Sequence, residues 1–172
     1  MNQSARRSRT GIPGAAAGLI ELWALAGGAV LALVMLMNVV SVGMSMAGSS
    51  FPGDFELTEI GVAVAAFAFL PYVQLMDGNV SADIFTQSAG PRLLALFRTL
   101  ACAVALAFAA LLLWKMYDGM LSQREYGYET AILQFPIWLG FVPAVISLGL
   151  LVVAAAITLA EALRDLTRGR TA

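Results

Sequence analysis

The run TAILQFPIWLGFVPAVISLGLLVVAAAITLA, residues 130–160, contains no Asp, Glu, Lys or Arg. A helix needs about 20 mostly apolar residues to cross a hydrocarbon core about 30 Å thick, so this run is long enough to span a membrane. Three more stretches are equally free of charge: residues 22–53, 60–76 and 99–114. The last two are short and need their flanks, where long basic side chains can reach the interface. The uncharged runs therefore predict four membrane-spanning helices.

The composition agrees with an integral membrane protein. Of the 172 residues, 60% are hydrophobic and 12% are charged, which is about half the charged share of roughly 25% in soluble domains. No segment between the runs is large enough to form a domain of its own. We expect one all-α membrane domain over residues 1–172, with helices at about 22–47, 55–76, 93–116 and 136–160.

The basic residues are unequally shared between the two sides of the predicted membrane domain. One side holds eight: Arg6, Arg7, Arg9, Arg92, Arg98, Arg164, Arg168 and Arg170. The opposite side holds Lys115 and Arg124. Because basic residues accumulate on the cytoplasmic side, both termini are expected in the cytoplasm. A cleaved signal peptide over residues 6–47 is the alternative, but its apolar run is longer than such peptides have.

Several function classes are excluded or disfavoured by what the chain lacks. It has no His, one Cys and a net charge of −1, so neither a Cys/His metal site nor a nucleic-acid surface is expected. No acid–base pair accompanies a nucleophile, so we expect neither an enzyme nor a cofactor. The helix centres carry no titratable group, which disfavours a stand-alone proton-coupled carrier.

Polar and small residues recur at helical spacing within two of the predicted helices. Asn38, Ser41 and Ser45 share one face of the first helix, and Ala101, Ala105 and Ala109 share one face of the third. Such faces let helices approach closely and form hydrogen bonds with each other. A pore lining is the alternative for the first of the two faces.

Two helix entries carry the other candidate residues. Glu56 and Glu59 follow Asp54 at the start of the second helix, where acidic groups complement the helix dipole or could anchor a partner. Pro136 suits the first position of the fourth helix, and Trp138 would then lie in the aromatic belt at the interface.

Short motifs in a fixed order suggest a family. They are Phe55-Glu-Leu-Thr-Glu59, Phe69-Leu70, Gly78-Asn-Val-Ser-Ala-Asp83, Pro91-Arg92 and residues 130–138 with Pro143. In order and spacing, the chain over about residues 20–160 resembles the small membrane subunit, of DctQ type, of TRAP (tripartite ATP-independent periplasmic) transporters. Asn79 departs from the pattern, since the family more often has a basic residue there.

The resemblance implies a bacterial inner-membrane, multi-pass subunit that braces a large permease. It also implies a periplasmic substrate-binding protein and membrane phospholipid as partners, and sodium-driven import of an organic acid. Glu56 and Glu59 would lie at the periplasmic end, where partner contacts form. Asp83 and Arg92 would flank a cytoplasmic turn and could form an ion pair. The alternatives are the small subunit of another tripartite carrier, a self-contained oligomeric channel or exporter, and a membrane anchor with no transport role.

Overall fold

The computed structural model describes residues 12–76 and 91–168, and these form four long helices. The helices are α1 (Ile12–Met46), α2 (Asp54–Leu75), α4 (Pro91–Tyr126) and α5 (Ile137–Arg168). Each of the four is long and apolar enough to cross a membrane. The described part of the chain therefore agrees with the predicted all-α class and with four candidate spans.

Three helices extend beyond the ends that the charge pattern predicts. α1 begins at Ile12 and not near residue 22, α4 continues past residue 116 to Tyr126, and α5 continues past residue 160 to Arg168. The uncharged runs mark only the part of a helix that suits hydrocarbon, whereas a charged residue such as Lys or Glu is itself a good helix former. The end of α4 comes where the backbone turns, at Gly127, whose φ is +64°.

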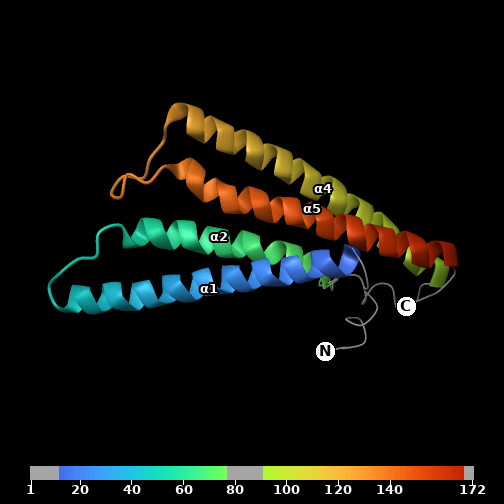
Figure 1. The fold of residues 1–172 in the computed structure, drawn as a ribbon, viewed down its shortest axis with the longest axis horizontal. Helices are drawn as coiled ribbons and strands as arrows, with labels where there is room; N and C mark the ends of the chain where they lie inside the picture. The colour runs from blue at the N-terminus through green and yellow to red at the C-terminus, as the bar shows by residue number, and fades with distance from the viewer. Residues whose placement is uncertain (1–11, 77–90, 169–172) are drawn as a thin grey trace.

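The helices form two hairpins that lie side by side (Figure 1). A turn over residues 47–53 joins α1 to α2, and a loop over residues 127–136 joins α4 to α5. Both connections lie at the same end of the molecule, which we call the loop end. Because the helices alternate in direction, the start of α1 and the end of α5 lie at the opposite end.

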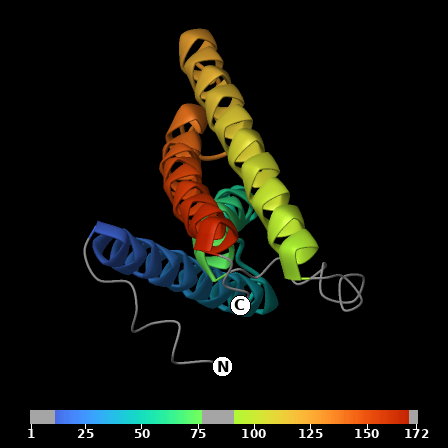
Figure 2. The same ribbon diagram turned by 90° about the vertical axis from the view of Figure 1, so that its right-hand side faces the viewer.

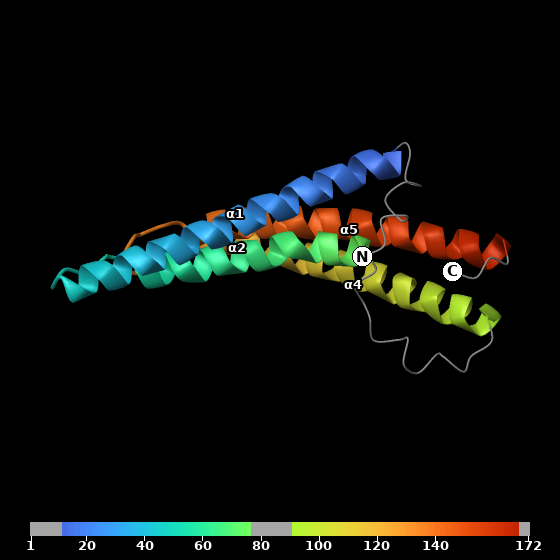
Figure 3. The same cartoon turned by 90° about the horizontal axis from the view of Figure 1, so that it is seen from below.

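The four helices form an open layer and not a closed bundle. α5 packs along both α4 and α2, α2 packs along α1, and α1 makes a smaller contact with α5, so the order across the layer is α1, α2, α5, α4. Figure 2 shows α1 and α4 on opposite sides of the α2 and α5 pair. Seen from below, α1 crosses α2 and α5 obliquely (Figure 3). Both edge helices therefore keep a broad apolar face away from the rest of the described chain.

Small residues allow α1 and α2 to pack closely. Gly27 of α1 lies so close to α2 that a Cβ there would be 2.6 Å from the Cβ of Ala68. Gly61 of α2 is packed in the same way against the side chain of Val34. Gly61, Ala65 and Ala68 are buried on one face of α2. In a membrane, where burial of apolar area does not drive helices together, such close backbone approach supplies the packing energy.

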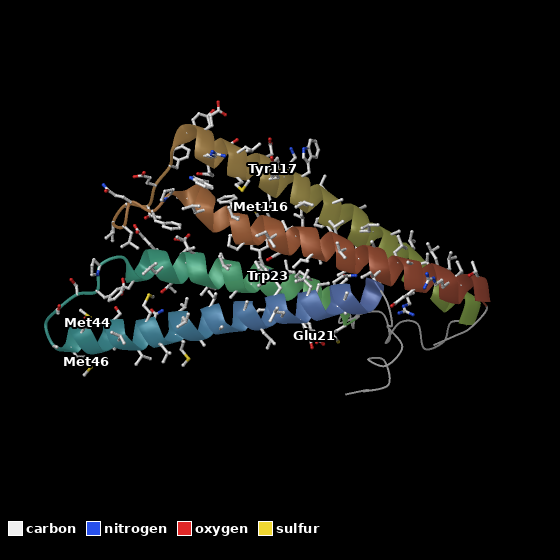
Figure 4. All side chains as sticks on the ribbon, in the orientation of Figure 1. Glu21, Trp23, Met44, Met46, Met116 and Tyr117 are labelled. Atoms are coloured by element: carbon white, nitrogen blue, oxygen red, sulfur yellow. The ribbon has the colours of Figure 1, made fainter. Side chains whose placement is uncertain are left out.

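Polar side chains link the helices within the apolar layer. The Trp23 indole donates a hydrogen bond to the Ser147 hydroxyl over 2.9 Å, which joins α1 to α5. The Gln74 amide donates to the Thr158 hydroxyl over 3.3 Å, which joins α2 to α5. Ser147 and Thr158 are buried, at 0% and 2% exposed. Figure 4 labels Trp23 on α1.

Candidate functional site

The loop end gathers most of the residues that the sequence singles out. Glu56 and Glu59 lie in the first two turns of α2, and Pro136 and Trp138 lie at the start of α5. The structure brings Glu56 into contact with the loop over residues 127–136. Met44 and Met46, labelled in Figure 4, mark the last turn of α1 at the same end.

The start of α2 is held to the end of α1 by polar contacts. The Ser41 hydroxyl donates to the Asp54 carboxylate, whose other oxygen accepts the N–H of Phe55 at 2.8 Å. The Asn38 amide donates to the Thr58 hydroxyl over 2.9 Å. Asn38 and Ser41 therefore link two helices, as the packing interpretation of this polar face predicts, whereas the third member of the face, Ser45, is exposed.

Glu56 holds the loop between α4 and α5. Its two carboxylate oxygens accept the N–H groups of Ile132, at 2.7 Å, and Leu133, at 3.0 Å. The Leu133 side chain packs over Gly53, where an added Cβ would lie 2.5 Å from the Leu133 Cγ. Hydrogen bonds from N–H groups to an ionised carboxylate are stronger than those between neutral groups. One side chain of α2 thus fixes a loop more than seventy residues further along the chain.

The loop has a compact shape of its own. The Thr130 N–H donates to the Phe135 carbonyl over 3.0 Å, and the Phe135 N–H donates to the Thr130 hydroxyl over 3.1 Å. Gln134 adopts a left-handed backbone with φ of +51°, which costs free energy for a residue with a Cβ. The hydrogen bonds of Thr130 and the contact of Leu133 with Gly53 therefore hold a strained turn.

The start of α5 differs by one residue from the expectation. Pro136 was expected at the first helical position, but it directly precedes α5, which begins at Ile137. Pro136 pairs with Glu129 in an isolated antiparallel bridge, and its carbonyl accepts the N–H of Leu139 at 3.1 Å. The proline belongs to the loop because this bridge holds its backbone outside the helix.

Trp138 connects α5 to the last turn of α4, at the loop end. The Arg124 guanidinium carbon lies 5.4 Å from the centre of the Trp138 ring, within the range of a cation–π contact. The rings of Tyr126 and Tyr128, which follow Arg124 in the chain, are 5.8 Å apart. The end of α4 and the start of α5 thus both carry aromatic groups at the loop end.

The remaining candidate residues have different environments. Glu59 is exposed and the structure shows it no partner within the described residues. Asp83 lies outside the described residues, as does its expected pairing with Arg92, which belongs to the first turn of α4. In the alanine stripe, Ala109 is buried and Ala101 is exposed, because the face of α4 that packs on α5 passes through Cys102.

Sequence reasoning missed the contacts that join distant segments. The hydrogen bond from Trp23 to Ser147 spans 124 positions in the sequence. The hydrogen bonds that Glu56 accepts from Ile132 and Leu133 span 76 and 77 positions. Only the carboxylate, the indole and the hydroxyl were visible as polar groups. Their partners depend on which helices become neighbours.

The loop end carries an excess of negative charge. Its six carboxylates outnumber two basic groups, so the net charge is −4; these residues are Asp54, Glu56, Glu59, Asp118, Glu125, Glu129, Lys115 and Arg124. Within residues 12–76 and 91–168, no three His, Cys, Asp or Glu side chains come together to hold a metal ion. The arrangement can attract a basic surface outside the membrane, and Glu59 and Glu129 are exposed to do so.

Comparison with known proteins gives one match. A family model described as "Tripartite ATP-independent periplasmic transporters, DctQ component" matches residues 31–165. No curated protein and no solved structure matches the chain. The matched residues run from the middle of α1 into the last turns of α5 and include the whole loop end.

Proposed function

Because this chain belongs to the DctQ component family of the tripartite ATP-independent periplasmic transporters, we propose that it is the fixed scaffold of such a transporter. Membership makes it the small permease subunit, a multi-pass membrane component with four candidate spans and not an enzyme. The family also implies a large permease and a periplasmic binding protein as partners. The scaffold role concerns how this subunit serves them.

The observation that carries the scaffold role is the use of the polar side chains inside the layer. Every buried side-chain nitrogen and oxygen among the described residues has a hydrogen-bond partner within the chain. Trp23 is bonded to Ser147, and Gln74 to Thr158, so these groups hold helices together. A solute path would need polar groups that face a wet cavity. In this subunit they join helices, which suits a rigid support for a moving partner.

The full function rests on the partners. In our proposal the large permease binds an organic acid and sodium and moves against this subunit, and the binding protein delivers the solute. The subunit lies in the bacterial inner membrane as one domain over residues 1–172. Both termini are cytoplasmic, which the eight basic residues of that side support. The loop end is then periplasmic.

The candidate residues have separate tasks in this proposal. Glu56 positions the loop through Ile132 and Leu133, and exposed Glu59 meets a basic group of a partner. Pro136 and Trp138 set where α5 leaves the loop. At the cytoplasmic end, Asp83 and Arg92 form an ion pair that orients the second and third spans. The opposite charges of the two residues support this pairing.

The first experiment is a pull-down of the tagged chain from its native membranes in mild detergent, with mass spectrometry of the associated proteins. A stoichiometric, much larger multi-spanning protein is expected. Recovery of the chain alone in several detergents would count against the assembly, and ion or solute flux through the reconstituted chain alone would then indicate a self-contained channel.

Uptake in proteoliposomes tests the scaffold role itself. The large permease with its binding protein should take up solute on a sodium gradient only when this subunit is present. Equal uptake without it would leave the chain as a membrane anchor. Uptake that does not depend on the sodium gradient would contradict the proposed energy source.

A further inference from the structure

The last turn of α1 carries a methionine that is almost wholly exposed. Met46 has 87% of its surface exposed, more than any other methionine within residues 12–76 and 91–168. Met44, in the same turn, is half-buried. Figure 4 labels both residues at the tip of α1, at the loop end. The Met46 thioether is therefore open to small molecules that reach this end of the subunit.

A hydrogen bond between α1 and α2 fixes the depth of this turn in a membrane. The Ser41 hydroxyl donates to the Asp54 carboxylate, so these two side chains lie at the same level. An ionised carboxylate is costly within hydrocarbon, which puts that level at the membrane surface. α1 continues past Ser41 to Met46, a further rise of about 7.5 Å at 1.5 Å per residue. Met46 therefore lies outside the hydrocarbon, on the water side of Asp54.

A second methionine of the same helix separates exposure from depth. Met35 is also largely exposed, at 62% of its surface. It precedes Ser41 along α1 by about 9 Å of helix, in the direction of the bilayer centre. Hydrocarbon therefore shields the Met35 thioether from charged, water-soluble reagents in a bilayer. Such a reagent should reach Met46 and not Met35.

We propose that Met46 is a site of reversible oxidation, at which a water-borne chloramine converts the thioether to the sulfoxide. The sulfur takes the chlorine as the N–Cl bond breaks, and the nitrogen takes a proton from water and leaves as the amine. Water then forms the S–O bond, and chloride and a proton leave. Sulfur loses two electrons, and the chloramine gains them. Methionine sulfoxide reductases reverse the change.

The exposure of Met46 decides what its oxidation does to the molecule. A sulfoxide replaces a flexible apolar side chain by a polar one, which disrupts packing where the methionine is part of a core. Met46 loses little packing, because most of its surface is already exposed. Oxidation therefore changes the chemistry of the loop end and leaves the fold unchanged. The site does not depend on the transport proposal.

The test is oxidation of the full chain in nanodiscs of saturated phosphatidylcholine, followed by peptide mass spectrometry. The reagent is N-chlorotaurine, whose sulfonate keeps it out of hydrocarbon. We expect Met46 to gain one oxygen at least about tenfold faster than Met35 or Met44. Equal rates at Met46 and Met35, or a faster reaction at Met44, overturn the proposal. In the chain unfolded by denaturant the three rates should be similar, and a preference for Met46 that persists there would show that the fold does not create the site.

Variants and a reversal step complete the test. Met46→Leu should remove the fast addition of oxygen, whereas the matched control Met35→Leu should retain it; a fast addition that survives in Met46→Leu refutes the assignment. Methionine sulfoxide reductases with dithiothreitol should restore the original peptide mass, and an addition that they leave in place is not the proposed product. The melting temperature should be the same before and after oxidation of Met46, and a lower value after oxidation would contradict its exposed position.

Discussion

The contact between Gly27 and Ala68 sets how closely α1 approaches α2, and it can be tested by adding one methyl group. In Gly27→Ala the new Cβ would lie 2.6 Å from the Cβ of Ala68. Carbon atoms pack at about 3.5–4.0 Å, and both atoms are attached directly to the backbone, so no side-chain rotation relieves the clash. The two helices must separate locally by about 1 Å.

The neighbouring glycine is the matched control. A Cβ at Gly28 would meet only the Phe69 ring, at an ordinary 3.9 Å. Both variants gain the helix preference of Ala over Gly, about 1 kcal/mol, so their difference isolates the clash. Overpacking costs typically about 1–3 kcal/mol. We expect Gly27→Ala to be less stable than Gly28→Ala by about 2 kcal/mol, which corresponds to roughly 4–8 °C in melting temperature for a chain of this size.

The assay is thermal unfolding in one detergent, followed by tryptophan fluorescence. The double variant Gly27→Ala with Ala68→Gly again has a single methyl group at the contact, carried by α1 and not by α2. Its melting temperature should therefore rise back toward that of Gly28→Ala. Equal melting temperatures for Gly27→Ala and Gly28→Ala would refute the close approach of α1 and α2. A double variant less stable than Gly27→Ala would refute the identity of the contact pair.

Three further predictions concern the loop end and the links between helices. Glu59→Lys should reduce recovery of the large permease or solute uptake without lowering the melting temperature. Glu56→Lys should lower the melting temperature as well, because two loop N–H groups lose their acceptor. An unchanged transport rate in the double variant removes both residues from the mechanism. Trp23→Phe and Ser147→Ala should show a coupling of about 0.6 kcal/mol in a double-mutant cycle of unfolding, and strictly additive effects would contradict their hydrogen bond. Gln134→Gly should stabilise the chain by about 1 kcal/mol because its φ of +51° suits glycine, and a lower melting temperature would show that the Gln134 side chain contributes more than the strain costs.

The candidate site was only partly accessible from the sequence. Glu56 stood out as an acidic residue at a helix start, a position where the helix dipole alone accounts for it. The hydrogen bonds that it accepts from Ile132 and Leu133 depend on the α4–α5 loop folding back over the turn between α1 and α2. Lys115 was read as the edge of a span, but α4 continues past it to Tyr126.

The sequence by itself determined the four candidate spans, because charged groups are costly in hydrocarbon and their absence marks each span regardless of its neighbours. It also indicated the family, through short motifs in a fixed order. The tertiary structure alone decided the order α1, α2, α5, α4 and the partners of Trp23, Gln74 and Glu56. Lipid tails are as apolar as the helix surfaces, so apolar burial does not select one neighbour over another. The choice falls to local shape, such as a missing Cβ at Gly27 opposite Ala68, and to single hydrogen bonds whose two ends lie far apart in the chain.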